Sequence, residues 1–149
     1  MRAVAQRVST AHVEVDGNVV GKIAAGLLVY LGAGKLDRQT DPAWMAEKLA
    51  TLRIFEDADG KMSRSVKDVG GAVLVVSQFT LYGDVRRGRR PSFDSAADPA
   101  TAEHAYLAVC AELAGHGLQV STGQFRARMQ VHAVVAGPVT ILIDSERQF

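Results

Sequence analysis

The stretch Ala72-Val73-Leu74-Val75-Val76-Ser77-Gln78-Phe79-Thr80-Leu81-Tyr82-Gly83 joins an apolar run to a set of polar side chains. A short continuous apolar run bounded by turn residues is typical of a buried strand, so we expect a strand over residues 72–82. Its alternation would place Gln78, Thr80 and Tyr82 on one face. Polar side chains at the end of such a strand often serve a function, although an ordinary strand end followed by a solvated loop explains the same pattern.

Upstream of this stretch, turn residues and apolar runs predict further strands and a helix. Asp16-Gly17-Asn18 is typical of a hairpin turn, with the alternating residues 2–15 before it and residues 19–23 after it. The glycine-bounded run 26–32 predicts a buried strand. Asp41-Pro42 predicts the start of a helix, because Asp can cap the free N–H groups and Pro suits the first helical position.

Downstream, Asp98-Pro99 repeats this helix start, and Gly115 and Gly117 are both suited to end the helix. Cys110 falls on the apolar side of that helix, where core packing accounts for it better than a nucleophilic role does. Three more strands are expected at residues 118–120, 129–135 and 139–143. The order of elements predicts an α/β fold with mixed β-sheet layers, a barrel-like β-sandwich, and two helices packed on one face, in a single domain spanning the chain.

Composition limits the classes of partner. The chain has 149 residues, of which 48% are hydrophobic and 22% charged, and this balance is typical of a globular domain. The net charge is only +1, so an anionic partner would have to be bound by a local patch, and Arg86, Arg87, Arg89 and Arg90 form the densest one. Neither a secretory signal nor a membrane-spanning apolar run is visible, so we expect a cytoplasmic chain without membrane contact.

Metal and nucleotide chemistry find little support in the sequence. The four histidines lack HExxH spacing, no compact His/Asp/Glu cluster is visible along the chain, and no phosphate-binding GxxxxGK[ST] motif occurs, so we expect no metal and no cofactor. The single cysteine excludes an intramolecular disulfide and a Cys-based zinc site. Asp57-Ala58-Asp59-Gly60 lacks the other ligands of a calcium loop, so a plain turn is expected there.

A Ser/His/Asp triad stays open, because its members come from distant positions in a chain. Ser77 or Thr80 would then be the nucleophile, and His12 or His132 the base. However, no G-x-S-x-G motif surrounds Ser77.

A second motif, Gly137-Pro138-Val139-Thr140, precedes the last expected strand. Proline cannot donate to a ladder, so it belongs at a strand start, an edge or a bulge. Together with Ser77-Gln78-Phe79-Thr80-Leu81 and with Arg87-Gly88-x-Arg90-Pro91-Ser92-Phe93, this motif closely resembles the D-aminoacyl-tRNA deacylases. The resemblance covers nearly the whole chain. In one departure, Val135 stands where the family commonly has Asn.

The resemblance implies an enzyme that hydrolyses the ester between a D-amino acid, or glycine, and the 3′ end of tRNA, and that leaves L-aminoacyl-tRNA intact. It further implies a cofactor-free homodimer, in which the Gly137-Pro138 bond is cis and enters the partner's active site. The candidate catalytic residues are Ser77, Gln78, Phe79 and Thr80. Two backbone N–H groups, of Phe79 and Thr80, and the Gln78 side chain would stabilise the tetrahedral oxyanion, while the 2′-OH of the terminal adenosine assists water.

The resemblance also assigns roles to the second motif and to the arginines. If the carbonyls of Gly137 and Pro138 accept hydrogen bonds from the substrate ammonium group, an L side chain would meet the protein wall. Arg86, Arg87, Arg89 and Arg90 would contact phosphates near the acceptor end. Two rival hypotheses remain: an RNA-binding module without turnover, and an esterase of another substrate class that uses Thr80 or Ser77 as a covalent nucleophile.

Overall fold

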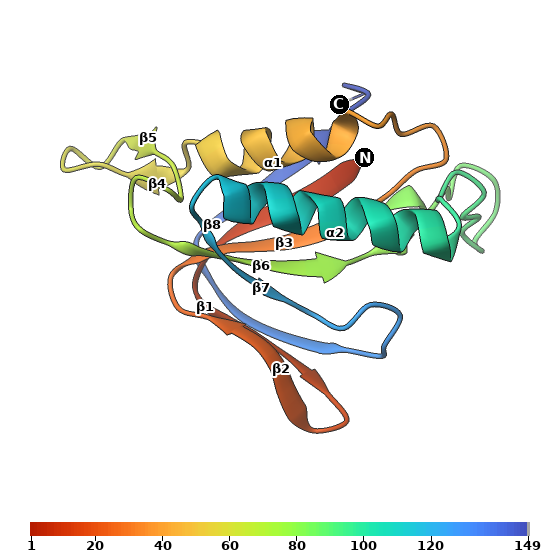
Figure 1. Ribbon diagram of the computed structural model, residues 1–149, viewed down its shortest axis with the longest axis horizontal. Helices are drawn as coiled ribbons and strands as arrows, with labels where there is room; N and C mark the ends of the chain where they lie inside the picture. The colour runs from red at the N-terminus through yellow and green to blue at the C-terminus, as the bar shows by residue number, and fades with distance from the viewer. Residues whose placement is uncertain (149) are drawn as a thin grey trace.

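The computed structural model describes residues 1–148, and one long strand near the start of the chain organises its sheet (Figure 1). The elements in chain order are β1 (Arg2–Val15), β2 (Asn18–Ile23), β3 (Gly26–Gly32), α1 (Asp41–Thr51), β4 (Phe55–Glu56), β5 (Met62–Arg64), β6 (Ala72–Ser77), the 3₁₀ helix η1 (Phe79–Tyr82), α2 (Pro99–Gly115), β7 (Gln119–Thr122) and β8 (Gln130–Asp144).

The main sheet follows the order β2-β1-β3-β6-β7, and β8 pairs with the other edge of β1. The β3–β6 and β6–β7 pairs are parallel, whereas the pairs that involve β1 are antiparallel. The Ser121 hydroxyl of β7 donates to the Lys22 carbonyl of β2 at 3.0 Å, which brings the two ends of the strand order together. The sheet is therefore a nearly closed mixed barrel, and both helices lie on one side of it (Figure 1). This confirms the predicted α/β class and the placement of the helices.

The sheet separates two apolar cores, which explains why its central strands are apolar at every position. On β3, Leu27 and Val29 face the helices, whereas Leu28 faces the barrel interior; all three are 0% exposed. Strand β6 alternates in the same way, with Val73 and Val75 toward the helices. A strand covered on both faces needs apolar side chains at odd and even positions alike.

Two strand predictions were wrong. The strand expected over residues 72–82 ends at Ser77, and η1 follows it, so the expected alternation of polar side chains beyond Ser77 does not exist. The strands expected at 129–135 and 139–143 are one continuous strand, β8, which carries Gly137 and Pro138 within it. Register shifts opposite Gln6–Thr10 of β1 accommodate these two residues as a bulge.

The two helix starts differ. Asp98 caps α2 as predicted, because its carboxylate accepts the N–H groups of Ala100 and Thr101. Asp41 does not cap α1: its carboxylate is 1% exposed and accepts hydrogen bonds from the Arg38 N–H and the Ser145 hydroxyl, and the capping position passes to Thr40. A partner distant in sequence thus takes the carboxylate away from the helix.

Two other local predictions, the turn at Asp57 and the core position of Cys110, are confirmed. The Asp57 carboxylate accepts the N–H groups of Asp59 and Lys61 and the Ser63 hydroxyl, as expected for a turn. Cys110 packs against the helix-side core, and burial raises the pKa of its thiol to about 11, so it stays protonated at neutral pH. Among the helices within residues 1–148, none has the length and apolar character required to cross a membrane.

Candidate functional site

The 3₁₀ helix η1 presents the first motif at the end of β6. The Gln78 N–H donates to the Leu31 carbonyl at 2.8 Å, which fixes the start of η1 against β3. Phe79 and Thr80 are exposed, and their N–H groups stand at the beginning of η1, where a backbone donor has no acceptor within the helix. Two adjacent N–H groups in such a position can bind an anion or a developing oxyanion.

Thr80 has an amide rather than a base as its neighbour. The Gln78 side-chain amide donates to the Thr80 hydroxyl. His12 and His132, the predicted candidate bases, stack on each other with ring centroids 4.5 Å apart and both approach Glu14. Among residues 1–148, the hydrogen bonds therefore give no support to a Ser/His/Asp triad.

A cleft of about 560 Å³ opens beside η1. Ser77, Gln78 and Phe79 line it together with the end of β3, the first turns of α2 and the loop before β8. Phe125 and Arg126 of that loop also line the cleft, and the sequence did not single them out because nothing local marks a loop that reaches back over the sheet. The apolar walls and the aromatic ring of Phe79 suit a flat, partly apolar ligand.

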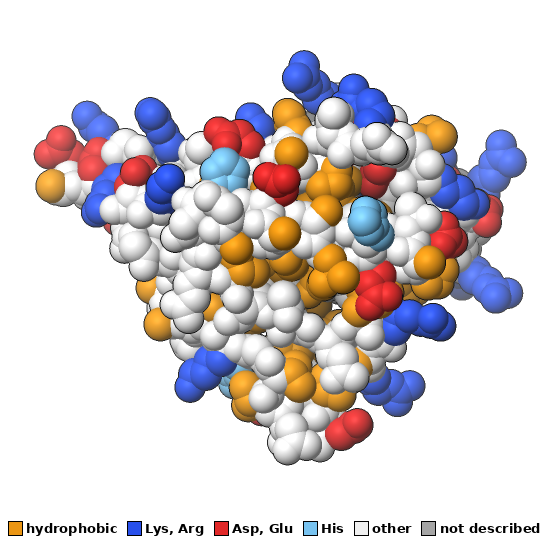
Figure 2. All heavy atoms as spheres, in the orientation of Figure 1, with side chains coloured by type: hydrophobic (Ala, Val, Ile, Leu, Met, Phe, Trp, Pro, Cys, Tyr) orange, Lys and Arg blue, Asp and Glu red, His pale blue; other side chains and the backbone are white. Residues whose placement is uncertain are grey.

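The loop that follows η1 carries the four arginines. Backbone hydrogen bonds between Asp84 and Ser92 close it, and Phe93 packs edge-on against Phe79 with centroids 5.0 Å apart, so the loop adjoins the cleft. Figure 2 shows Lys and Arg side chains projecting around the edges of the face that carries α2.

The four arginines are not equivalent. The Arg86 Nη2 atom lies 2.5 Å from the Asp84 Oδ2 atom, and the hydrogen bonds that Arg86 donates lower the pKa of the Asp84 carboxyl to about 2. Arg87, Arg89 and Arg90 are exposed, and within residues 1–148 no carboxylate is found within ion-pair distance of them. Three of the four predicted phosphate contacts are therefore free to bind an anion.

The second motif lies on β8, next to Arg7. The Gly137–Pro138 peptide bond is cis, and both residues are exposed. The Arg7 guanidinium donates to the Ala136 carbonyl at 3.1 Å and to the Ile54 carbonyl at 2.7 Å. Gly137 has φ +123°, and a Cβ there would lie 2.8 Å from the Arg7 guanidinium, so the position requires glycine. The sequence did not identify Arg7 as a site residue, since only the pairing of β1 with β8 brings it to the motif.

A single chain does not bring the two motifs together. Neither Gly137 nor Pro138 lines the cleft, whereas Ser77, Gln78 and Phe79 do. Strands β1 and β3 lie between β8 and β6 in the sheet, and three strand spacings amount to about 14 Å.

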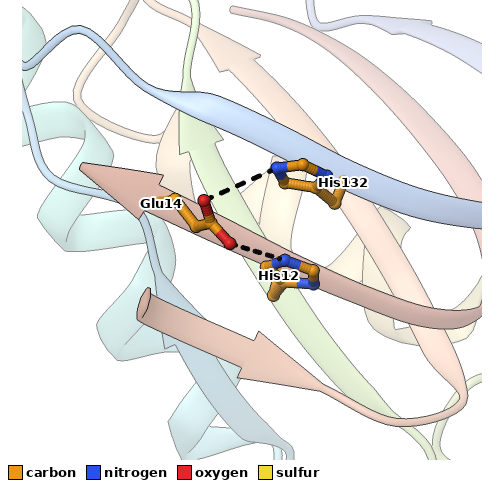
Figure 3. Close-up of side chains that lie close together, drawn as sticks. All are labelled: His12, Glu14 and His132. Carbon is orange, nitrogen blue, oxygen red and sulfur yellow. Dashed lines mark hydrogen bonds and ion pairs between the residues drawn. The ribbon is translucent and has the colours of Figure 1, made fainter. Parts of the chain in front are cut away.

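The structure also assembles a cluster that the sequence did not reveal. His12, Glu14 and His132 gather where β1 pairs with β8 (Figure 3). The expectation that no compact His/Asp/Glu cluster exists was therefore wrong. The reason is that strand pairing joins residues 120 positions apart, which no local spacing rule detects.

Comparisons with known proteins agree with the two motifs. The family model for D-Tyr-tRNA(Tyr) deacylase matches residues 4–144. A D-aminoacyl-tRNA deacylase of Desulfitobacterium hafniense (strain DSM 10664 / DCB-2) is 58% identical, and one of Anaeromyxobacter dehalogenans (strain 2CP-C) is 60% identical, each over all of both chains.

Two solved structures share the fold. A c-Myc DNA unwinding element binding protein superposes with a TM-score of 0.91 at 40% identity, over 97% of this chain and 99% of the other. A probable eukaryotic D-amino acid tRNA deacylase superposes with a TM-score of 0.82 at 17% identity, over 95% of this chain and 97% of the other, which supports the fold alone. The family model matches most of this chain, and relatives that it covers in full share more than half of its residues. The chain therefore belongs to the D-Tyr-tRNA(Tyr) deacylase family.

Proposed function

We propose that this chain hydrolyses the ester between a D-amino acid and the terminal ribose of tRNA, accepts glycyl-tRNA as well, and leaves L-aminoacyl-tRNA intact. The observation that carries the proposal is the pair of N–H groups of Phe79 and Thr80 beside an apolar cleft, in a chain of this family. An aminoacyl ester is already activated, so its hydrolysis needs mainly position and stabilisation of charge.

The chemistry begins with attack of water on the ester carbonyl. The carbonyl oxygen becomes negatively charged, and the N–H groups of Phe79 and Thr80 would donate to it, with the Gln78 amide nearby. The neighbouring 2′-OH of the terminal adenosine would orient the water, which accounts for the absence of a base in contact with the Thr80 hydroxyl within residues 1–148. The terminal adenine would lie in the cleft between its aromatic and apolar walls.

Chirality would be read by the second motif. The Gly137 and Pro138 carbonyls would accept hydrogen bonds from the substrate ammonium group, which turns an L side chain against the protein. Because this motif does not line the cleft of its own chain, a second copy would have to supply it. Within residues 1–148, β8 pairs with β1 alone and exposes Val134 and Leu142, and such an edge can serve as a subunit contact.

The test is hydrolysis of matched D-tyrosyl-, L-tyrosyl- and glycyl-tRNA by purified protein in the presence of EDTA. We expect release from the D-ester and from glycyl-tRNA, with the L-ester stable. Release from both D- and L-esters would identify an esterase without a chiral filter. Binding of tRNA without release would favour an RNA-binding module and overturn the proposal.

A further inference from the structure

The cluster of His12, Glu14 and His132 follows from the register of two strands. His12 and His132 are direct partners in the antiparallel β1–β8 ladder, and Glu14 lies two residues along β1, which puts it on the same face as His12. Ala11 and Val13, which flank His12 in the sequence, are 1% and 0% exposed because they point into the barrel. The three polar side chains therefore stand together on its outer face.

The donor atoms converge on a small volume. The His12 Nε2 atom is 3.2 Å from one Glu14 carboxylate oxygen, and the His132 Nε2 atom is 3.8 Å from the other (Figure 3). The candidate ligand atoms of the three residues lie within 4.8 Å of one another. Bonds of about 2.0–2.2 Å in a tetrahedral zinc site imply ligand atoms about 3.3–3.6 Å apart, so the donor atoms must move closer together to hold an ion. The two imidazole rings are stacked nearly parallel, so one ring must also rotate before both nitrogens point at the same ion.

We propose that His12, Glu14 and His132 bind a divalent transition-metal ion of the zinc class. Two imidazole nitrogens and one carboxylate suit Zn²⁺, Co²⁺ or Ni²⁺, whereas Mg²⁺ and Ca²⁺ prefer oxygen ligands alone. In the single chain the side chains are 30%, 28% and 48% exposed, respectively, so water can complete the coordination of the ion there. Val134, part of the subunit contact proposed above, lies two residues from His132 on the same face, so the site borders that contact.

The site is separate from the cleft proposed for ester hydrolysis, because none of its three residues lines that cleft. Its ligands come from both strands of the β1–β8 pair, so a bound ion would cross-link β8 to the barrel. We expect the ion to stabilise the fold by mass action rather than to take part in hydrolysis. Lys22 lies opposite His12 on β2, where its long side chain can turn away into solvent.

The test uses the full chain without a polyhistidine tag, stripped with EDTA and then dialysed. Calorimetric titration with ZnCl₂ at pH 7.5 should show one ion per chain, and titration with MgCl₂ should show none. Replacement by Co²⁺ should give the visible absorption of a site with nitrogen and oxygen ligands. Zn²⁺ should also raise the thermal midpoint of the protein.

Single variants His12→Ala and His132→Ala should each weaken zinc binding more than about tenfold, since losses even outside the ligand shell commonly cost 10–100-fold. His104→Ala is the matched control, because His104 is an exposed histidine on α2 outside the cluster. Circular dichroism checks that each variant is folded. Absence of stoichiometric zinc binding, or zinc binding that both variants retain, would overturn the proposal.

Discussion

Thr80 is an exposed hydroxyl whose role depends on its surroundings. It accepts a hydrogen bond from Gln78, and an amide cannot remove its proton. If Thr80 contributes its backbone N–H rather than its hydroxyl, Thr80→Ala should retain single-turnover hydrolysis of D-tyrosyl-tRNA within about tenfold of the parent rate. Gln78→Ala is the comparison, and it should cost more if the amide helps to bind the oxyanion. A folded Thr80→Ala variant that loses more than about a thousandfold in rate would favour the covalent nucleophile.

Asp41 is a buried carboxylate with consequences for stability. Burial tends to raise its pKa, but hydrogen bonds from the Arg38 N–H, the Ser145 hydroxyl and the Arg38 guanidinium outweigh burial and hold the pKa below its usual range. A carboxyl group with a lowered folded-state pKa contributes stability above its unfolded pKa of about 4, and this contribution is lost as the pH falls through the folded-state pKa.

Asp41→Asn should therefore lower the free energy of unfolding at pH 7 by about 3 kcal/mol, since it removes one partner of a buried ionic group. The difference from the parent should shrink as the pH falls through the lowered folded-state pKa of Asp41, because the parent carboxyl then also becomes protonated. Urea denaturation over a series of pH values from 7 downward measures this difference, and Asp59→Asn, in an exposed turn, serves as the control. A loss of stability that stays the same at every pH would show that charge is not the cause.

At the scale of elements, one ion pair makes Arg86 differ from the other three arginines of the loop that follows η1. Arg86 is held by Asp84, whereas Arg87, Arg89 and Arg90 extend into solvent. We expect Arg87→Gln, Arg89→Gln and Arg90→Gln each to weaken tRNA binding and to reduce the salt dependence of log K by about 0.7–0.9 per lost phosphate contact. Arg86→Gln should change binding less, because Asp84 already offsets its charge.

Binding of D-tyrosyl-tRNA over a series of salt concentrations measures these slopes. Lys67→Gln is the control, since it removes an exposed cation from a different loop. If the four arginine variants all keep the slope of the parent, the loop does not contact phosphate.

The elements also show which parts of the fold the sequence could predict. Hairpin, helix and buried-strand signals are local, and they located β1, β2, β3 and the start of α2. The turn of η1 was missed because Gln78-Phe79-Thr80-Leu81 has the composition of a strand, whereas its backbone closes a turn in which the Leu81 N–H donates to the Gln78 carbonyl. Contacts between β1 and β8 decide the rest: the placement of Arg7 beside Ala136, and of His12 beside His132.

At the scale of the whole molecule, the barrel separates the two halves of the proposed site. Phe79 lies on η1, which follows β6, whereas Gly137 lies on β8, and only Phe79 lines the cleft. If a second copy supplies Gly137 and Pro138, a variant damaged in one half can be rescued by a variant damaged in the other.

Phe79→Pro and Gly137→Ala form the pair for this experiment. Proline suits the first position of a helix but removes the N–H donor, while Phe79→Ala keeps the donor and serves as its control. Alanine at Gly137 would adopt an unfavourable φ of +123° and press on Arg7. Each variant alone should be nearly inactive toward D-tyrosyl-tRNA.

After the two variants are unfolded, mixed in equal amounts and refolded together, half of the dimers should be mixed, and each mixed dimer holds one intact site. The mixture should therefore recover about a quarter of the parent activity, and sedimentation should show a dimer. Activity can recover only if Phe79 and Gly137 of one active site come from different chains. If both residues of a site came from the same chain, every site in the mixture would carry one of the two substitutions. No recovery from well-folded dimers, or full activity in a parent monomer, would mean that Gly137 acts within its own chain or not at all.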